Sequence, residues 1–385
     1  MSDKTSFDWD PRNPAILSDQ RQAYDDMRER CPVAHSEFLD WSVFRHEDIV
    51  NILADPDTYS NSSKRKSIPN GMDQPEHTLY RKALEPFFSP EATVVFEADC
   101  RNIAVETVRS LRSEGAEAEL VTAFARPFSA KSLCAYLGWP HDQWEQLDDW
   151  INGNQQAAFA HDRQAGKELA LAFIRIVNDA LNIRRKAGVE TCNDITAKLM
   201  TMQVAGQPLS DDDIASVLRN WIAGHGTLSA SIGILTLYLA QHPQVQEQLR
   251  VEPELLPVAI DEILRVDGPL VANNRTTTRA VEIGGRTIAA GERLSLIWIA
   301  ANRDGRAFND AKNVNFQADH DRRGQNLVFG SGIHDCVGAP LARLEMRIAM
   351  EELLRGTQSI ELADAPPVRS SYPSNGLETL TVRLD

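Results

Sequence analysis

The chain has 385 residues, enough for one large domain or two ordinary ones with a core that can enclose a cofactor. Its 40 Lys and Arg residues are outnumbered by 55 Asp and Glu residues, and a net charge of −15 argues against nucleic acid as a main partner. Five cysteines without paired spacing predict no disulfide framework and a reducing, cytoplasmic compartment.

The chain begins with a polar, charged stretch, residues 1–10, so the sequence predicts neither a signal peptide nor a membrane anchor. Apolar stretches such as residues 228–240 fall short of the roughly 20 residues that a bilayer requires, and Ser and Thr interrupt them. We expect them to be core helices of a protein that does not enter a membrane. Without an internal repeat or long linker, residues 1–385 are predicted to form one domain.

Helices dominate the predicted elements. After an extended arm with Pro11 and Pro14, a first helical pattern covers residues 19–30, and helical periodicity continues through most of residues 90–265. Residues 281–299 instead indicate three short strands, separated by glycine turns at 284–285 and at 291. The sequence therefore predicts a mainly α fold with small β-sheets.

A further helix is predicted to begin near residue 73. Asp73 can cap it, Pro75 suits its first turn and Glu76 completes a capping box. His77 and Arg81 then lie four residues apart on one face, where two donors can bind the same carboxylate. A solvated helix face is the alternative interpretation of this pair.

The longest predicted helix covers residues 211–241. Ser210 can cap it, Asp213 approximates a capping box and Pro243 marks its end. At 1.5 Å per residue this helix would be about 46 Å long. That length suffices to cross a whole domain, so we expect a long central helix.

A glycine-rich loop at residues 329–338, with the sequence FGSGIHDCVG, places Cys336 immediately before another helical pattern. The positive end of a helix dipole favours a deprotonated sulfur, and glycines let the backbone lie against a flat macrocycle. These features are typical of a thiolate that binds haem iron. Taken alone, the motif leaves a second interpretation open, a buried cysteine in a tight turn.

Two other ligand sites fit the loop poorly. A zinc site needs about four ligands, whereas His334 and Cys336 supply two and no C-x-x-C pair accompanies them. A dinucleotide-binding loop would need a third glycine where Asp335 stands.

With these pieces in order, the chain resembles the cytochrome P450 family, in particular its soluble bacterial members, from about Asp25 to Leu384. The cysteine loop fits the family's F-G-x-G-x-H-x-C-x-G. Upstream, residues 262–265 (EILR) resemble the family's E-x-x-R. The resemblance implies a fold in which haem b (iron protoporphyrin IX) lies between the long helix and the cysteine loop.

The resemblance also assigns roles to residues. Cys336 would bind iron, and Glu262 and Arg265 would support the cysteine loop, with a third basic partner left uncertain at His320. The other haem-binding positions that it implies are His77, Arg81, Arg275 and His334 for the propionates, and Phe329 and Gly338 in the loop. Further matches are residues 302–304 (NRD), Phe308 and residues 376–382, which resemble the family's closing hairpin.

The chain departs from the family pattern in the middle of the long helix. Residues 223–227 are Ala223, Gly224, His225, Gly226 and Thr227, whereas the family has A-G-x-acid-T, so Gly226 stands at the acidic position. In the family the acid and the threonine widen the helix and relay protons for oxygen activation. Glycines cost a helix about 1 kcal/mol each, which lets the widening persist here. We expect Thr227 and ordered water to supply protons; His225 is either a donor or an outward, solvated or hydrogen-bonded side chain.

The positions that the resemblance places around the substrate mix apolar groups and amides. They are Trp221, Leu270, Val271, Ala272, Asn273 and Asn375, beside residues 223–224 and the loop at 372–375. This mixture predicts a small, moderately polar organic substrate. The short segment at residues 60–73 predicts a thin or mobile cover over it.

The expected function is a haem-thiolate monooxygenase that inserts one oxygen atom from O2 into a small organic substrate. A monomer would receive electrons from a separate ferredoxin or flavodoxin, docked on basic residues near the cysteine loop. These are Arg81, Lys82, Arg322, Arg323, Arg343 and Arg347. The alternatives are peroxide-driven oxygenation, an O2-independent rearrangement, and a haem sensor or carrier without turnover.

Overall fold

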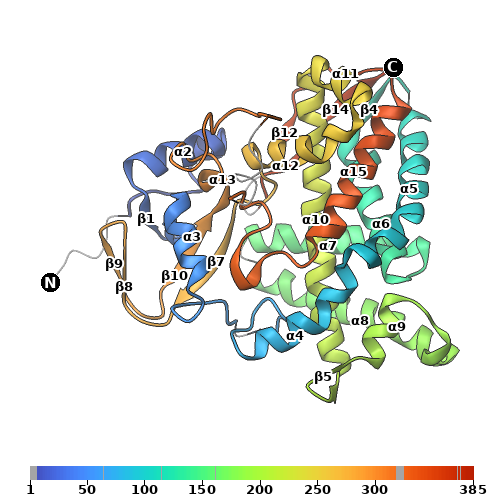
Figure 1. Cartoon of the computed structure of the whole chain (residues 1–385), viewed down its shortest axis with the longest axis horizontal. Coiled ribbons are helices and arrows are strands. Elements are labelled where there is room, and N and C mark those ends of the chain that lie inside the picture. Colours follow the sequence, from blue (N-terminus) through green and yellow to red (C-terminus); the bar gives the residue numbers. More distant parts are fainter. Residues whose placement is uncertain are drawn as a thin grey trace. The chain divides into compact units, whose positions relative to one another are not determined.

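The computed structural model describes residues 7–63, 65–113, 115–160, 162–317, 325–370, 372 and 374–385. Helices form most of this part of the chain, and the sheets are small (Figure 1). The predicted mainly α fold is confirmed. Its residues pack into two compact units, each of which combines segments distant in the sequence.

The first unit contains Met1–Arg65, Asn70–Thr78 and Asp261–Cys336. Its elements are α1 (Pro14–Leu17), α2 (Gln20–Arg30), β1 (Val33–Ser36), β2 (Asp40–Val43), α3 (His46–Ala54), β3 (Tyr59–Ser60), β7 (Ala272–Thr277), β8 (Val281–Ile283), β9 (Arg286–Ile288), β10 (Arg293–Ile297), α13 (Trp298–Ala301) and the 3-10 turn η6 (Gly332–His334). The main sheet has the order β1-β2-β10-β7-β3, and β8 pairs with β9.

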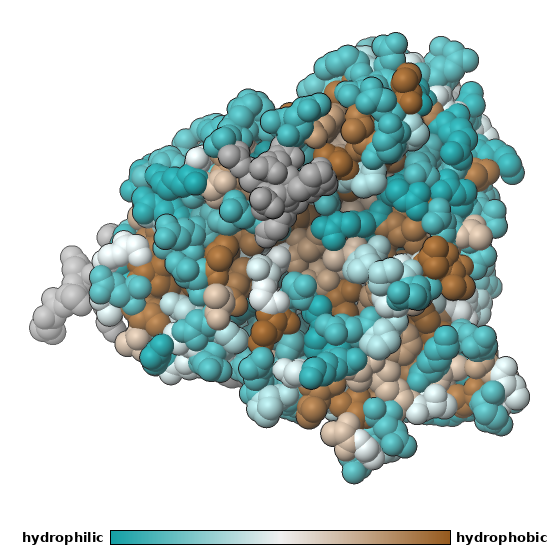
Figure 2. Space-filling view, viewed as in Figure 1, coloured by the Kyte–Doolittle hydropathy of each residue, from teal (hydrophilic) through white to brown (hydrophobic). Residues whose placement is uncertain are grey.

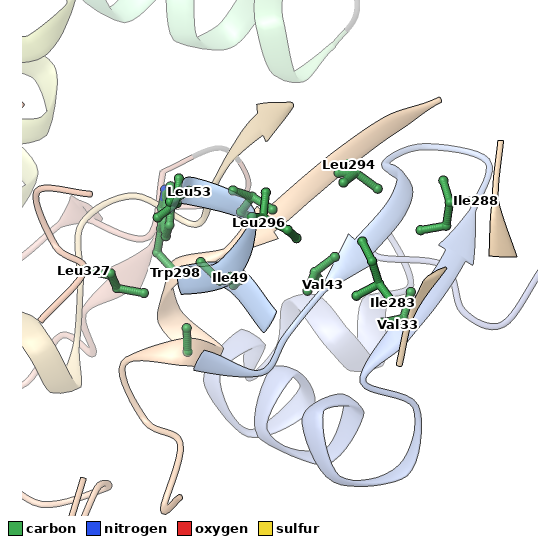
Figure 3. Close-up of a cluster of buried hydrophobic side chains, with 12 residues drawn as sticks. Val33, Val43, Ile49, Leu53, Ile283, Ile288, Leu294, Leu296, Trp298 and Leu327 are labelled. Atoms are coloured by element: carbon green, nitrogen blue, oxygen red, sulfur yellow. The ribbon is translucent and has the colours of Figure 1, made fainter. Parts of the chain in front are cut away.

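This sheet buries one face in an apolar cluster. Val43 of β2 and Leu294 and Leu296 of β10 contribute to it, together with Ile49 and Leu53 of α3 (Figure 3). Alternate residues of a strand point to opposite faces, which is why Leu294 and Leu296 share a side. The cluster fixes α3 and β10 within the unit.

The predicted strands at 281–299 are confirmed up to residue 297. The last two residues belong instead to α13, which begins at Trp298. The Trp298 amide donates to the carbonyl of Val271 over 2.9 Å, and its side chain is buried. Burial of this indole in the apolar cluster thus turns the chain out of the sheet.

The second unit contains Lys66–Pro69, Leu79–Ile260 and Val337–Asp385. Its helices are η1 (Glu85–Phe88), α5 (Pro90–Ser113), the π-helical turn η2 (Val121–Ala125), α6 (Arg126–Leu137), η3 (His141–Gln143), α7 (Trp144–Phe159), α8 (Arg163–Ala187), η4 (Val189–Thr191), α9 (Ile195–Thr201), α10 (Asp211–Gln241), α11 (Pro243–Val251), η5 (Pro253–Leu255) and α15 (Ala339–Gly356). Its strands are β4 (Glu117–Glu119), β5 (Gln203–Val204), β6 (Gln207–Pro208), β11 (Ile360–Leu362), β12 (Val368–Arg369), β13 (Leu377–Thr379) and β14 (Thr381–Leu384). Two helices, α4 (Glu76–Leu84) and α12 (Leu256–Val266), include residues of both units.

Helix α10 confirms the predicted long helix. The Ser210 hydroxyl accepts from the Asp213 amide at 3.2 Å, and the Asp213 carboxylate accepts from the Ser210 amide at 3.0 Å. Within its unit α10 packs against α6, α7 and α15 (Figure 1). By length and composition this one described helix could cross a membrane, but 61% of its most apolar window is buried. The face drawn in Figure 2 is mostly hydrophilic, with hydrophobic residues scattered over it.

The expected capping box at the start of α4 is wrong. The helix begins at Glu76, and the Asp73 carboxylate accepts instead from the Ser60 hydroxyl at 2.5 Å and from the Asn61 amide at 2.9 Å. The Asp73 carboxylate thus holds the segment after β3, whereas only the Asp73 backbone carbonyl bonds the helix, accepting from the His77 amide over 2.8 Å.

Two other expectations need correction. Residues 376–382 do not form a closing hairpin, because β13 pairs with β12 whereas β14 pairs with β11 and β4. Residues 66–69, part of the cover that was expected to be thin or mobile, are hydrogen-bonded to α10. The Ile68 amide donates to Ser216 over 2.9 Å, and the Asn220 amide group donates to the Ile68 carbonyl over 2.8 Å.

Candidate functional site

Backbone turns hold Cys336 at the end of the glycine-rich loop in the first unit. Its amide donates to the carbonyl of Phe329 over 2.8 Å, which closes the loop, and its side chain is exposed. Gly330 and Gly332 have φ values of 71° and 75°, which glycine adopts without strain. A Cβ on Gly332 would also lie 2.5 Å from the Leu53 carbonyl oxygen of α3. The loop can therefore approach α3 only with glycine at this position.

The segment that leads into the loop is fastened at three successive residues. The Gln325 carbonyl lies 2.8 Å from His46 Nε2. The Asn326 side chain donates to the Asp261 carbonyl over 3.0 Å, and the Leu327 amide donates to Asn302 Oδ1 over 2.8 Å. These bonds come from three separate elements, so they fix where the loop begins.

In the E-x-x-R pair Arg265 is buried and Glu262 is partly buried. Arg265 Nε and Nη2 donate to both oxygens of Glu262, over 2.9 and 2.7 Å. The same guanidinium donates to the backbone carbonyls of Asn302, Ala311 and Asn313 over 2.7, 2.7 and 3.0 Å. Only planar arginine presents donors in enough directions for these five bonds. The pair thus joins α12 to residues 302–313, which include the NRD motif; His320 lies outside the described residues.

Three of the expected propionate donors lie in the first unit. The imidazole rings of His77 and His334 are 4.2 Å apart. Arg275 of β7 is buried, and it donates to the neutral oxygens Asn61 Oδ1 and Asn274 O over 3.1 and 2.8 Å. Burial lowers the pKa of Arg275 to about 10, and the Asp73 charge only partly opposes this shift. Arg81, in the second unit, forms an ion pair with Glu85 at 2.9 Å.

This donor set fits a haem. An exposed thiol on a glycine loop suits an iron ligand, and a buried guanidinium bonded to neutral oxygens suits an anion such as a propionate. The described residues contain no cluster of three or more His, Cys, Asp or Glu side chains that could hold a bare metal ion.

The segment of α10 that departs from the family pattern, residues 223–227, lies in the second unit. Ala223, Gly226 and Thr227 are half-buried, Gly224 is exposed, and the Thr227 carbonyl accepts from Ser231 Oγ over 2.8 Å. Gly226 faces α7, because a Cβ there would lie 2.5 Å from Gln155 Nε2 and 2.7 Å from Ile151 Cγ2. The position of the family's acid is therefore closely packed.

His225 does not point outward into solvent. The side chain is buried, with Nδ1 3.0 Å from the Trp221 carbonyl and Nε2 3.4 Å from Glu345 Oε1 on α15. The solvated interpretation is wrong, because α15 supplies a carboxylate that draws the ring inward. The ring is buried and hydrogen-bonded, and a proton-donor role for His225 stays a prediction.

The expected substrate positions have different environments. Trp221 is buried against Phe87 and Phe88, with ring centroids 5.7 and 4.8 Å away, and its indole nitrogen has no hydrogen-bond partner among the described residues. In the first unit Leu270 is half-buried, Val271 and Ala272 are buried, and Asn273 is exposed. In the second unit Asn375 is buried, and its carbonyl accepts from Arg369 over 3.3 Å.

Sequence reasoning missed Glu345, Ser132 and Gln155. Glu345 is buried between Leu341 and Ile348, on the stripe that faces the core. An acidic residue on an apolar helical stripe was a usable signal. Ser132 and Gln155 gave no such sequence signal, because a serine and a glutamine are ordinary on any helix.

Comparisons with known proteins agree on one family. A family model described as Cytochrome P450 matches residues 139–359. The chain is similar to the cyclomarin C epoxidase CymV of Salinispora arenicola, at 31% identity over 364 residues, 89% of each chain. It is also similar to the erythromycin C-12 hydroxylase of Saccharopolyspora erythraea, at 31% identity over 85% of this chain and 84% of that protein. The ligand-free structure of cytochrome P450 TbtJ1 matches with a TM-score of 0.85 and 27% identity, over 100% of both chains.

Proposed function

The chain belongs to the cytochrome P450 family of haem-containing monooxygenases, and we propose that Cys336 binds the iron of its haem b (iron protoporphyrin IX). The observation that carries this proposal is the loop closed by the Cys336 amide and the Phe329 carbonyl, which presents an exposed thiol. Among the five cysteines, Cys100 and Cys134 are buried, and burial raises the pKa of both thiols. A thiolate ligand needs the opposite environment.

Four residues are proposed to bind the haem propionates: His77, Arg81, Arg275 and His334. Of these, Arg275 has the strongest support, because its buried charge is bonded only to neutral oxygens in the hydrogen bonds described. Phe329 and Gly338 would contact the macrocycle at the two ends of the loop. Glu262 and Arg265 would keep the loop's supporting segment in place. Residues 1–385 would then act as one haem domain.

The reaction puts one oxygen atom of O2 into an organic substrate and releases the other as water, with two electrons and two protons consumed. When bound, haem supplies the site at which O2 is activated. The chain's own task is to hold substrate and to bring protons. We assign proton delivery to Thr227 and ordered water, in a segment that also includes Ala223, Gly224 and His225. Gly226 cannot contribute a side chain.

The proposed substrate is a small, moderately polar organic molecule, bound by Trp221, Leu270, Val271, Ala272, Asn273 and Asn375. The buried indole N–H of Trp221, without a partner among the described residues, supports a polar contact with it. Hydroxylation or epoxidation is the proposed outcome, since the relatives are named as a hydroxylase and an epoxidase. A screen of compounds by spin-state shift of the haem spectrum would find candidates.

Electrons are proposed to come from a ferredoxin or flavodoxin that docks on basic residues. Lys82 and Arg343 are exposed. Arg347 is bonded to Glu97 and Glu351 at 3.0 and 2.7 Å, and Arg81 to Glu85, so their charges are largely compensated. Arg322 and Arg323 lie outside the described residues. We further propose a monomer in the cytoplasm.

Labelled oxygen tests the proposed reaction. With a substrate from the screen, NADH and a ferredoxin system, product formed under ¹⁸O₂ should carry one labelled atom. Product with oxygen only from peroxide would favour peroxide-driven oxygenation, which the absent acid at Gly226 makes the second candidate. Unlabelled product formed without O2 would indicate rearrangement. No product under any electron supply would indicate a sensor or carrier.

The proton assignment has its own test. Gly226→Glu alone would clash with Ile151 and Gln155, so the informative variant combines Gly226→Glu with Ile151→Ala and Gln155→Ala, and its control carries the two alanine changes alone. A restored acid should raise the fraction of NADH that ends in product. Unchanged coupling in the triple variant would reject the assignment of proton delivery to this segment.

A further inference from the structure

A buried polar cluster joins α6, α10 and α15 inside the second unit. The Glu345 side chain is 1% exposed and accepts a hydrogen bond from Ser132 Oγ over 2.5 Å. His225 Nε2 lies 3.4 Å from the same carboxylate oxygen, an ion-pair distance rather than a tight hydrogen bond. Ser129 Oγ of α6 donates to the backbone carbonyl of His225 over 2.7 Å. The cluster thus fixes one turn of α10 to two other helices.

The tautomer of His225 follows from its partners. A carbonyl can only accept, so the Trp221 carbonyl at 3.0 Å requires a proton on Nδ1. Nε2 is then the nitrogen that gains or loses a proton, and it is the nitrogen that faces Glu345. A proton can pass between Nε2 and the carboxylate without any change in the net charge of the pair.

Three charged groups on the helices that pack against α10 and α15 are bonded to other partners. Arg101 of α5 is held by Glu97, Glu351 and Glu352. In the same way Lys131 of α6 is paired with Glu106, and Asp148 of α7 with Arg126. A buried carboxylate is costly unless a cation or a proton neutralises it. Among the ion pairs of the described residues, Glu345 forms one, with His225.

The thiol and the phenol near Glu345 do not neutralise its charge. Burial, followed by the Glu345 charge, raises the pKa of the Cys100 thiol on α5 and of the Tyr136 phenol on α6. Both therefore stay uncharged. Burial works against protonation of His225, but the Glu345 carboxylate outweighs it and raises the pKa of His225 above its ordinary value of 6.5.

We propose that His225 and Glu345 form a buried pair that holds one exchangeable proton and keeps it available to the α10 turn that carries Thr227. The existence of the proton-holding pair does not depend on the reaction. Its supply of protons to Thr227 rests on the proposed function, because the monooxygenase reaction consumes protons. The pair compensates for Gly226: within residues 223–227, His225 is the only side chain that titrates near neutral pH. His225 and Glu345 are thus positioning residues, which act through Thr227 and water.

Histidine NMR tests the pair without any turnover. The full-length, haem-loaded protein, labelled with ¹⁵N-histidine and kept diamagnetic as the reduced carbon monoxide complex, is titrated; His225→Gln identifies the signal. We expect a midpoint above 6.5 in the wild type and a lower midpoint in Glu345→Gln. The matched control is Glu352→Gln, which removes a second buried carboxylate of α15 that is bonded to Arg101 and Arg355. This control should leave the His225 midpoint unchanged.

The outcomes separate the two halves of the proposal. A wild-type midpoint at or below 6.5 overturns the pair, and this result needs no variant to fold. An equal fall in Glu345→Gln and Glu352→Gln overturns the specific link to Glu345. If the titration behaves as expected, Glu345→Gln should also lose several-fold in product per NADH and change the solvent isotope effect, with unaltered substrate affinity. Unchanged coupling overturns the proton supply, whereas absence of product from every variant and the wild type counts against the proposed function alone.

Discussion

Gln155 Nε2 lies 2.5 Å from the point that a Cβ on residue 226 would occupy. Ile151 Cγ2, one turn earlier on α7, lies 2.7 Å from the same point. Glycine at 226 is therefore a packing requirement as well as a missing acid. The two roles of this position, chemical and steric, cannot be changed independently by one substitution.

A pair of alanine variants tests this packing. Gly226→Ala should lower the melting temperature, because Ile151 and Gln155 must move, and overpacking a closed site costs about 1–3 kcal/mol. Gly224→Ala is the matched control: a Cβ there meets nothing within 4 Å. With strain absent, the better helix propensity of alanine should stabilise α10 by up to about 1 kcal/mol. A shift of the same sign in both variants would contradict the account.

Arg265→Lys should destabilise the protein strongly and weaken its binding of haem. Lysine cannot reproduce the two bonds to Glu262 and the three to backbone carbonyls, and disruption of a buried pair costs about 3–5 kcal/mol. Thermal unfolding and the haem retained after gel filtration measure both effects. Arg383→Lys is the control, since Arg383 pairs with the exposed carboxylates of Glu117 and Asp364 and should change stability by less than about 1 kcal/mol. Equal losses in both variants would remove the special role of Arg265.

Arg275→Gln should affect the apoprotein and the haem complex in opposite directions. Burial lowers the pKa of Arg275 to about 10, which marks a guanidinium that the fold holds at a cost, so a neutral amide should raise the melting temperature of the apoprotein. If a propionate binds this cation, the same change should speed the transfer of haem to a second, haem-accepting protein. Faster transfer in a variant whose own haem-free form is not stabilised would indicate general damage. Unchanged transfer would exclude the propionate contact.

Stability should fall as the pH rises through the raised pKa of His225. Glu345 keeps that pKa above 6.5 in the folded protein, so the folded state binds this proton more tightly than the unfolded state. The resulting stabilisation is complete below about pH 6.5 and disappears above the folded-state pKa. Melting temperatures across this range should show the loss in the wild type and not in Glu345→Gln. Parallel curves for the two proteins would argue against the linkage.

Local signals along the chain are strong enough to predict much of the fold. Ser210 and Asp213 form the expected capping box, and α10 ends at Gln241 beside Pro243. These features depend on neighbours in sequence, so a sequence can specify them. Asp73 shows where this logic fails: its carboxylate binds Ser60 and Asn61, and no local pattern reveals that competition.

In the candidate site, too, local sequence patterns predict some residues, and other features depend on tertiary packing. Glycine spacing and the E-x-x-R pattern are sufficient to indicate Cys336, Glu262 and Arg265 as candidate residues. The burial of His225 against Glu345 could not be predicted, because the two residues are far apart in sequence and meet only when α10 packs on α15. The packing of α7 against Gly226 could not be predicted for the same reason. Contacts between distant helices depend on tertiary packing, which periodicity does not encode.

The central claim is that Cys336 provides the thiolate ligand of a haem, and the carbon monoxide spectrum of the reduced protein tests it most directly. The account predicts a Soret band at the long wavelength typical of a thiolate-bound haem. It also predicts loss of that band in Cys336→Ser and its retention in Cys192→Ser, a half-buried cysteine elsewhere in the chain. A short-wavelength, histidine-type Soret band in the wild-type protein would contradict the assignment of Cys336.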